Sequence, residues 1–333
     1  MKTEAILVNG ILDAGFGTVE VGEPGEGEVL AKAVVSLVST GTEMRIFRQG
    51  YANTEFPIVP GYSAVGTVQE TGSGVTGIKA GDSVFLPGGN RITEGAGALW
   101  GSHCLHQTVA ADSLIKLPDG CSRDQAAFIN VAGIALHGVG FADMKAGERA
   151  VVIGLGLIGQ CSVRGLLARG AEVIACDIDA ERRGLAEGIG VPCIDPAVGE
   201  LSEQVYAQWE DGPDAVFEVT ARPDMVNVAA NLLRARPWDG SGRAPRLVLQ
   251  ANYTESFSFG ARDLFQREAM VLSPRANLPA DRELAAKLIA DGALQIDNLV
   301  PARSRPQHAA EVYGKLLENP GNQVTAIFDW SQL

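Results

Sequence analysis

The feature that most constrains the fold is a glycine-rich turn between an apolar run and a helix-like stretch. The apolar run, residues 150–153, leads into a G-x-G-x-x-G sequence formed by Gly154, Gly156 and Gly159. A second apolar run follows the helix-like stretch, and Asp177 stands at its end. In such a unit the first glycine permits the tight turn, the second lets backbone amides approach a pyrophosphate, and the third lets the helix pack on the sheet. The segment therefore predicts a strand–turn–helix–strand unit that binds a dinucleotide.

The groups around this turn are the expected cofactor contacts. The helix N-terminus at Leu157 and Ile158 offers free N–H groups and a positive dipole end to phosphates. A carboxylate at Asp177 can accept hydrogen bonds from a ribose diol and would repel a 2′-phosphate. We therefore expect NAD, with NADP less favoured, although Arg182 or Arg183 could host that phosphate. The expected cofactor-binding residues are Gly154, Gly156, Leu157, Ile158, Gly159, Asp177, Ile178, Arg182, Thr220, Gln250 and Ser273.

Length, charge and cysteine content narrow the class of protein. A chain of 333 residues is long for one hydrophobic core, so two domains are expected. A net charge of −13 argues against a nucleic-acid partner. No apolar run approaches the ~20 residues of a membrane helix, and the N-terminus lacks a signal-peptide pattern. The five scattered cysteines suit a reducing compartment. We therefore expect a cytoplasmic protein whose partner is a small-molecule substrate, with no nucleic acid and no membrane.

The two halves of the chain follow different patterns. Short β-prone runs separated by turn residues predict a small barrel or sandwich in the first 120 residues. These runs are residues 5–8, 28–36, 66–71, 83–86 and 107–110. The later part alternates helix and strand patterns, which is typical of a doubly wound parallel sheet. Its helices are predicted at 123–140, 180–188, 202–209, 223–233, 280–291 and 307–318, and its later strands at 214–219, 246–250, 270–272 and 323–329. Residues 236–245 have the composition of a loop.

This order of units resembles the medium-chain dehydrogenase/reductase family. The resemblance rests on GYSAVGTV (residues 61–68), AGDSV (80–84), Leu-Pro at 117–118 and the glycine-rich turn. It implies an α/β protein with a GroES-like β-rich catalytic domain and a Rossmann domain with a doubly wound parallel sheet. The implied domains are 1–130 for the first part of the catalytic domain, 131–272 for the dinucleotide-binding domain and 273–333 for a return segment that completes the catalytic domain. The resemblance also implies a ligand cleft between the domains and a homodimer formed near residues 266–272.

The positions that hold zinc in metal-dependent members of this family carry neutral side chains here. By the resemblance, Thr40 and Tyr62 replace a cysteine and a histidine ligand, and the third ligand position falls near Asn130. Zinc prefers thiolate, imidazole or carboxylate ligands. The region that corresponds to a structural zinc lobe of four cysteines holds only Cys104. We therefore expect no metal at either position.

A different metal site remains an alternative. His103, Cys104 and His106 are close in sequence, and Glu43 or Glu94 could join them. All of these side chains would have to converge from one short turn, so polar residues that line a loop are the favoured interpretation.

The sequence STGTE at residues 39–43, with Pro-Gly-Tyr at 60–62, is similar to a zinc-lacking subgroup that includes bacteriochlorophyllide dehydrogenase. Without a Lewis acid, a developing alkoxide needs hydrogen-bond donors. We predict Tyr62 as the general acid/base, with Thr40 and Thr42 as hydrogen-bonding partners. A phenol has an unperturbed pKa of ~10, and a nearby cationic nicotinamide would favour the phenolate. The alternative is that Tyr62 is a packed aromatic residue whose hydroxyl simply finds a partner.

The predicted function is that of a zinc-independent, NAD-dependent oxidoreductase. It would transfer a hydride between nicotinamide and a secondary alcohol or ketone of a small metabolite, which is sugar-like, a cyclitol or a tetrapyrrole. One alternative is an NADPH-dependent quinone or enone reductase, which cofactor preference and inactivity toward alcohols would reveal. The other is a catalytically silent dinucleotide-binding protein, which would bind NADH without turning over any alcohol or carbonyl compound.

Overall fold

The computed structural model describes residues 1–50, 54–318 and 323–333. The chain forms two compact units, each assembled from separate stretches of sequence. Unit 1 consists of Met1–Val131, Glu283–Asp291 and Leu299–Leu333, and unit 2 consists of Ala132–Arg282 and Gly292–Asn298. The predicted domains 1–130, 131–272 and 273–333 stay a prediction, because a compact unit is not by that fact an independently folding domain.

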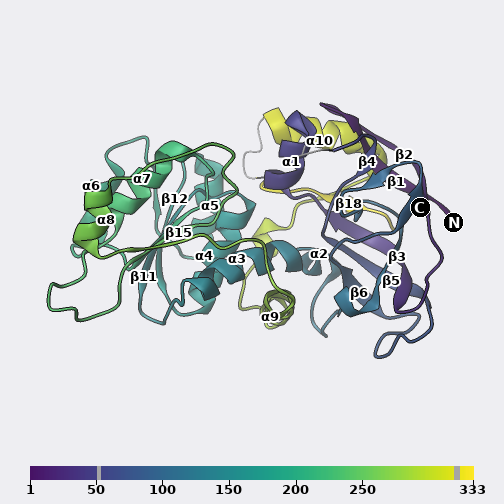
Figure 1. The fold of residues 1–333 in the computed structure, drawn as a ribbon, viewed down its shortest axis with the longest axis horizontal. Coiled ribbons are helices and arrows are strands. Elements are labelled where there is room, and N and C mark those ends of the chain that lie inside the picture. The colour runs from purple at the N-terminus through teal and green to yellow at the C-terminus, as the bar shows by residue number, and fades with distance from the viewer. Residues whose placement is uncertain (51–53, 319–322) are drawn as a thin grey trace. The chain divides into compact units, whose positions relative to one another are not determined.

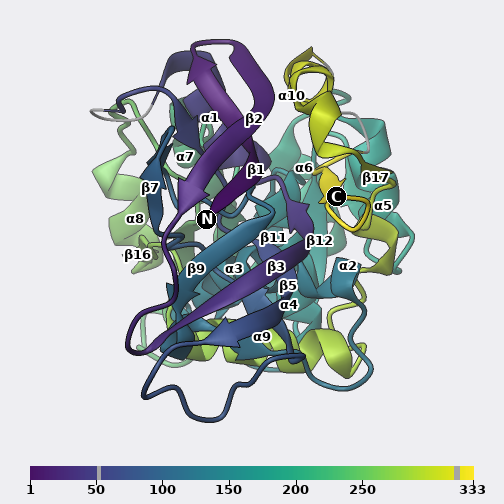
Figure 2. The same ribbon diagram turned by 90° about the vertical axis from the view of Figure 1, so that its right-hand side faces the viewer.

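Unit 1 is built on two mostly antiparallel sheets (Figures 1 and 2). One has the strand order β7-β2-β1-β4-β8, and the other has β10-β6-β5-β3-β18-β17 with β9 paired to β3. Its strands are β1 (Lys2–Gly10), β2 (Asp13–Val21), β3 (Glu28–Leu37), β4 (Ile58–Val59), β5 (Ala64–Thr71), β6 (Ser83–Leu86), β7 (Ile92–Glu94), β8 (Gly97–Ala98), β9 (His106–Ala110), β10 (Ile115–Lys116), β17 (Arg303–Ser304) and β18 (Ile327–Asp329). All five runs predicted in the first 120 residues are strands. The closing strand is shorter than the predicted 323–329.

Helix α1 (Thr40–Gln49) is an element that the sequence did not predict. Its first turn contains Gly41 and two threonines, which are weak helix formers. The helix is stabilised instead by burial of Met44, Ile46 and Phe47. The tertiary contacts of a short helix thus decide the conformation of the segment that holds Thr40 and Thr42.

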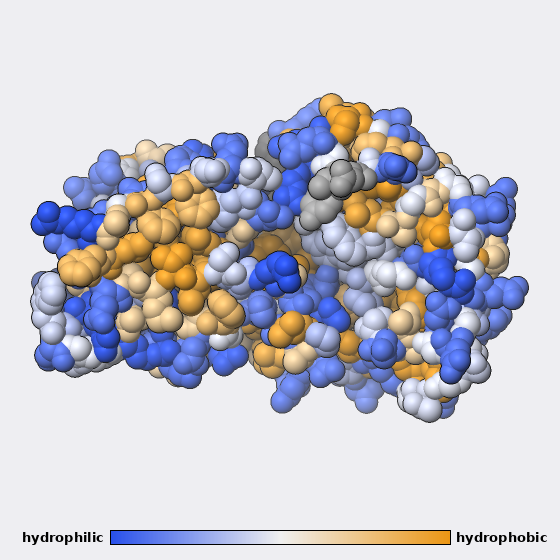
Figure 3. Space-filling view, in the orientation of Figure 1, coloured by the Kyte–Doolittle hydropathy of each residue, from blue (hydrophilic) through white to orange (hydrophobic). Residues whose placement is uncertain are grey.

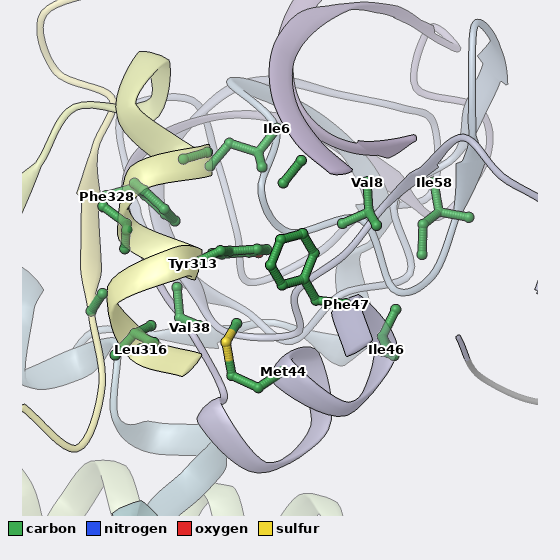
Figure 4. Close-up of a cluster of buried hydrophobic side chains, with 14 of the residues drawn as sticks. Ile6, Val8, Val38, Met44, Ile46, Phe47, Ile58, Tyr313, Leu316 and Phe328 are labelled. Carbon is green, nitrogen blue, oxygen red and sulfur yellow. The ribbon is translucent and has the colours of Figure 1, made fainter. Parts of the chain in front are cut away.

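The main core of unit 1 fixes α1 against α10 (Ala309–Glu318). Phe47 of α1 and Tyr313 of α10 meet edge to face, with ring centroids 5.4 Å apart and an interplanar angle of 71° (Figure 4). Ile6, Val8 and Phe328 belong to the same buried cluster. Helix α10 therefore packs against α1, although the two helices are far apart in sequence.

Unit 2 contains a parallel sheet with the strand order β13-β12-β11-β14-β15-β16. Its strands are β11 (Arg149–Ile153), β12 (Glu172–Cys176), β13 (Cys193–Ile194), β14 (Ala215–Glu218), β15 (Arg246–Leu249) and β16 (Met270–Leu272). Its helices are α4 (Leu157–Ala168), α5 (Ala180–Glu187), α6 (Leu201–Gln208), α7 (Pro223–Leu232) and α8 (Ala261–Arg267), while α3 (Ile129–Phe141) and α9 (Pro279–Ala290) each include a unit boundary.

Both faces of this sheet are buried, as the near-continuous apolar runs predict. Ala150 and Val152 of β11 pack on one face with residues of α3, α4 and α5. Val151 and Ile153 pack on the other face with residues of α6 and α7. The predicted α/β class with a doubly wound parallel sheet is therefore confirmed.

The predicted helix 123–140 is in fact two helices, α2 (Arg123–Ala126) and α3. They are separated by Ala127 and Phe128, which are fully buried. None of the helices in the described part of the chain is long and apolar enough to cross a membrane.

Candidate active site and cofactor-binding turn

The three glycines of the turn in unit 2 meet three different requirements. Gly154 has φ 94°, a left-handed value that favours glycine, and a Cβ there would lie 2.8 Å from Thr220 Cγ2. A Cβ at Gly159 would lie 1.8 Å from the Gly154 carbonyl oxygen, so this glycine permits the close approach of α4. A Cβ at Gly156 would meet nothing within 4 Å. The position at the start of α4 is therefore open, which suits the approach of a phosphate group to the helix N-terminus.

Asp177 lies directly beside this turn. Its Oδ2 accepts a hydrogen bond from the Leu155 amide at 2.6 Å, and its Oδ1 accepts one from the Asp179 amide at 2.9 Å. Arg182 Nη1 is 3.9 Å from Oδ2, and Arg183 donates to the Asp177 carbonyl oxygen at 2.7 Å. The backbone thus holds a carboxylate at the carboxyl end of β12, next to the open start of α4.

A second buried acid at the carboxyl ends of the strands was not found from the sequence. Glu218 ends β14 and is fully buried. Its carboxylate accepts hydrogen bonds from the Thr220 amide at 2.9 Å, from the Thr220 hydroxyl and from the Tyr253 hydroxyl. Burial raises the pKa of Tyr253, and the hydrogen bond to Glu218 raises it further. These bonds hold Thr220 in place. The next residue, Ala221, has a left-handed backbone with φ 60°. An acid at the end of the apolar run 215–218 is the signal that could have identified this anchor.

The other predicted cofactor contacts have different surroundings. Gln250 follows β15 as predicted, but its side-chain amide donates to the carbonyl oxygens of Ile134 at 2.8 Å and Ala135 at 3.1 Å. It also accepts a hydrogen bond from the Ser162 hydroxyl, so its polar atoms are engaged within the unit. Ser273 follows β16 and is exposed, and Ile178 is also exposed. The turn residues and Asp177 are thus the part of the predicted set that the structure brings together most closely.

In unit 1, two of the three predicted catalytic residues, Thr42 and Tyr62, form a hydroxyl cluster together with Ser39. The Tyr62 hydroxyl is hydrogen-bonded to the Ser39 hydroxyl and donates to Thr42 Oγ1 at 3.4 Å. Trp100 packs edge to face on Tyr62, with ring centroids 5.2 Å apart. Thr40 points elsewhere, because its hydroxyl donates to the Val324 carbonyl oxygen at 2.9 Å. The structure therefore brings Thr42 to Tyr62 and adds Ser39, which the sequence did not single out.

Burial raises the pKa of Tyr62 above its ordinary value. The hydrogen bonds with Ser39 and Thr42 act in the opposite direction, since they stabilise the phenolate. Of the nearby charges, Glu43 raises the pKa and Arg45 lowers it. The Tyr62 hydroxyl is consequently protonated at neutral pH in the protein alone.

A buried polar network lies behind this cluster and centres on Glu43. Glu43 Oε1 accepts a hydrogen bond from the Ser39 amide at 2.8 Å. Oε2 is 2.8 Å from His103 Nε2 and accepts a hydrogen bond from the Tyr313 hydroxyl at 2.7 Å. Burial together with the Glu43 carboxylate raises the pKa of Tyr313 well above its ordinary value. Glu43 therefore holds a backbone amide near the site.

The far side of the imidazole completes the network. His103 Nδ1 is 2.7 Å from the Ser36 hydroxyl, which accepts a hydrogen bond from Trp330 Nε1 at 2.8 Å. Both ring nitrogens of His103 therefore have partners, and the imidazole joins Ser36 to Glu43. The sequence could not reveal this network, because its members come from β3, α1, the loop before β9, α10 and the C-terminal segment.

The donor set at the family's zinc position does not fit zinc. Tyr62 is a protonated phenol engaged with two hydroxyls, and the Thr40 hydroxyl is committed to a backbone carbonyl. Asn130 could supply only a neutral amide oxygen. Neutral oxygens of this kind do not replace the thiolate, imidazole and carboxylate ligands of zinc sites. Over the ranges that the structure describes, no group of three or more His, Cys, Asp and Glu side chains is placed to hold a metal ion.

The alternative site in the loop before β9 is also unsuited to a metal. Both ring nitrogens of His103 have hydrogen-bond partners, and His106 Nδ1 is 2.9 Å from the Thr3 hydroxyl. Burial raises the pKa of the Cys104 thiol to about 12, whereas a metal binds the thiolate. These three side chains are therefore structural polar groups of unit 1.

Comparison with known proteins agrees with this architecture. Residues 25–119 match the family described as Alcohol dehydrogenase GroES-like domain, and residues 158–237 match the family described as Zinc-binding dehydrogenase. The chain is 28% identical over 339 aligned residues to 2-desacetyl-2-hydroxyethyl bacteriochlorophyllide A dehydrogenase of Cereibacter sphaeroides, with 99% of each chain covered. The predicted GroES-like character of unit 1 is thereby confirmed.

Two solved structures share the fold. One is a dehydrogenase of Sinorhizobium meliloti described as zinc-binding and solved with NADP, with a TM-score of 0.84, 24% identity and 99% of each chain covered. The other is an alcohol dehydrogenase of Escherichia coli complexed with NADH, with a TM-score of 0.86 and 19% identity, covering 98% of this chain and 99% of that one. The fold, the glycine-rich turn and the matches over nearly the whole chain lead to one conclusion: the protein belongs to the medium-chain dehydrogenase/reductase superfamily of NAD(P)-dependent oxidoreductases.

Proposed function

We propose that this chain is a zinc-independent, NAD-dependent oxidoreductase of a secondary alcohol or its ketone. The observation that carries the proposal is the hydroxyl cluster of Ser39, Thr42 and Tyr62, which includes the residue that, by the family resemblance, replaces the histidine ligand. The substrate class we propose is a small sugar-like, cyclitol or tetrapyrrole metabolite. The bacteriochlorophyllide dehydrogenase relative supports the last of these.

The preference for NAD is supported by the surroundings of Asp177. Its carboxylate is held beside the turn by two backbone amides. Arg183, one of the two arginines that could host a 2′-phosphate, pairs with Asp195 at 2.9 Å, and the other, Arg182, lies near Asp177 itself. The pyrophosphate would be held at Gly156, Leu157 and Ile158, and the bound nicotinamide would supply the hydride chemistry.

The proton is the task of the protein's own residues. With a raised pKa, Tyr62 is a proton donor at neutral pH and suits protonation of the alkoxide formed when a ketone is reduced. In the oxidation direction the phenolate must accept a proton, so the rate should rise with pH toward the pKa of Tyr62. Trp100, edge-on to Tyr62, excludes water from one side of the phenol.

The test is the variant Tyr62→Phe, which keeps the ring and the contact with Trp100. We expect at least a hundredfold loss of kcat/KM with any substrate found in a panel of alcohols and ketones, because general acid–base catalysis contributes about 10²–10⁴. Binding of NADH, followed by fluorescence, should be unchanged. Unchanged turnover would refute the role of Tyr62, and activity that disappears with chelators and returns with zinc would refute zinc independence.

We also propose a cytoplasmic homodimer formed along β16. This strand is at the edge of the sheet, where unpaired backbone groups can extend the sheet into a second copy. Phe265, Met270 and Trp238 expose large apolar surfaces beside it, and Figure 3 displays apolar side chains gathered over this part of unit 2. Light scattering should give about twice the chain mass of 34.9 kDa, and Met270→Glu should give the monomer. A wild-type monomer at micromolar concentration would contradict this proposal.

A further inference from the structure

The N-cap residue of α1 does not cap its helix. Ser39 occupies this position with an extended backbone, and serine there normally accepts a hydrogen bond from an amide of the first turn. Its side chain makes no such bond. The same chain provides a contrast, because Ser122, the N-cap of α2, accepts a hydrogen bond from the Gln125 amide in a capping box. The Ser39 hydroxyl is instead hydrogen-bonded to Tyr62.

The diverted hydroxyl is held in place by the buried network. Glu43, one turn further along α1, accepts a hydrogen bond from the Ser39 amide. Its carboxylate is itself held by His103 and Tyr313. Ser39 and Glu43 are both almost fully buried, so water does not compete for these hydrogen bonds. The Ser39 side chain thus gives up a cap worth about 1 kcal/mol and makes its hydrogen bond to Tyr62 instead.

We propose that Ser39 is a positioning residue that makes the Tyr62 phenol more acidic, by donating its hydroxyl proton to the phenol oxygen. This inference rests on the proposed function of Tyr62 as the general acid/base. Either hydroxyl can donate in the bond between Ser39 and Tyr62, and we assign the proton to Ser39 because the Tyr62 hydroxyl donates to Thr42 Oγ1. When Tyr62 is ionised, the same Ser39 proton stabilises the phenolate.

The charges that face the phenol do not replace this bond. From α1, Glu43 opposes ionisation of Tyr62 and Arg45 favours it. The loop before β9 contributes Trp100, which has no charge, and His103, which is directed at Glu43. Among the described residues, Ser39 and Thr42 are the groups hydrogen-bonded to the Tyr62 oxygen, and the bond to Thr42 is long.

The experiment follows the ionisation of Tyr62 in the full chain without any substrate. All five tyrosines are replaced by 3-fluorotyrosine, and the Tyr62 signal in the ¹⁹F NMR spectrum is identified by its loss in Tyr62→Phe. The test variant is Ser39→Ala, with Ser39→Thr as the conservative variant that keeps a hydroxyl. Ser39→Gly replaces the alanine variant if that does not fold, since glycine is tolerated at an N-cap. The matched control is Ser63→Ala, because the buried Ser63 hydroxyl has no hydrogen-bond partner among the described residues.

We expect Ser39→Ala to move the Tyr62 signal at neutral pH and to shift its titration upward by about half to one pH unit, a three- to tenfold change in acidity. Ser39→Thr should restore most of the shift, and Ser63→Ala should match the wild type. The pH profile of kcat/KM for alcohol oxidation should move in the same direction. Identical Tyr62 signals and titrations in Ser39→Ala and wild type would overturn the inference. If the signal shifts but Tyr62→Phe keeps full turnover, the role of Ser39 toward Tyr62 stands and the proposed function fails.

Discussion

The glycine-rich turn of unit 2 and the hydroxyl cluster of unit 1 are built in opposite ways. The turn is made of backbone, and nearly all of its requirements come from a short stretch of consecutive residues. The hydroxyl cluster is made of side chains, and the network behind it joins Ser36 to Trp330 and Glu43 to Tyr313, across 294 and 270 positions of sequence. A backbone site tolerates few residue types and can be identified from a motif. A side-chain site depends on which distant elements pack together.

The two regions also differ in how a substitution destabilises them. At Gly159 of the turn, an added methyl group strikes the backbone of Gly154, which cannot move aside cheaply. In the network, a lost partner leaves a buried polar group without a hydrogen bond, which costs about 1–3 kcal/mol.

The largest effect is expected at the turn. Gly159→Ala should lower the free energy of unfolding by about 3 kcal/mol and abolish NADH binding, because its Cβ would lie 1.8 Å from the Gly154 carbonyl oxygen. Gly156→Ala is the matched control for folding, since its Cβ would meet no protein atom within 4 Å. It should cost about 1 kcal/mol or less but weaken NADH binding about tenfold or more, measured by urea unfolding and fluorescence titration. Equal stability of the two variants would break the contrast.

The next effect is expected in the network. Glu43→Gln keeps the shape of the side chain but turns an amide toward the Tyr313 hydroxyl and His103 Nε2, which now approach a carboxylate oxygen. We expect a loss of about 2 kcal/mol in the free energy of unfolding. Glu311→Gln removes an exposed acid of α10 and should cost less than about 0.5 kcal/mol. If urea unfolding gives equal losses, the buried network does not stabilise unit 1.

A smaller and more specific effect is expected at the cofactor acid. Asp177→Asn removes the negative charge beside the turn while keeping one acceptor oxygen. NADH binding should weaken about tenfold, or about 1.4 kcal/mol, and the ratio of NADH to NADPH affinity should fall by at least that factor. Glu187→Gln, at the exposed end of α5, should leave this ratio unchanged. A wild-type protein that prefers NADPH would contradict the choice of NAD.

The smallest effect under ordinary conditions is a pH dependence of stability. The pKa values of Tyr62 and Tyr313 are raised in the folded protein, mainly by burial. In the unfolded chain a phenol ionises near pH 10, so above that pH the unfolded state binds fewer protons than the folded state. The stability contributed by each phenol is fully present below pH 10 and is lost as the pH rises further, by up to about 1.4 kcal/mol per unit. Tyr62→Phe should make the decline above pH 10 shallower, whereas equal slopes would refute this origin.

Local sequence patterns were sufficient to predict the glycine-rich turn of unit 2 and the elements beside it. The continuous apolar run of β11 and the glycine spacing are properties of neighbouring residues, so the strand, the turn, α4 and Asp177 could all be predicted. Glu218 was missed although a polar residue ends its apolar run, because its partner Tyr253 comes from a separate segment. Gln250 was placed correctly at the end of β15, but only the fold directs its amide to α3.

Unit 1 was harder because its decisive contacts are not local. The β-prone runs were recognised, while α1, whose first turn contains Gly41 and two threonines, depends on burial against α10. Tyr62 and Thr42 were predicted as neighbours from the family resemblance. Ser39 was not, because an N-cap serine looks the same in sequence whether it caps its helix, as Ser122 does, or not.

The sequence by itself determined the dinucleotide-binding unit, because that unit follows from residue type and spacing. The neutral residues at the positions of the metal ligands followed from the family resemblance. Only the tertiary structure decided where each hydroxyl points and which groups surround Glu43. Hydrogen-bond direction and burial depend on elements that lie far apart along the chain and meet only in the folded protein. The chemistry proposed for Tyr62 therefore depends on packing in unit 1 that no motif encodes.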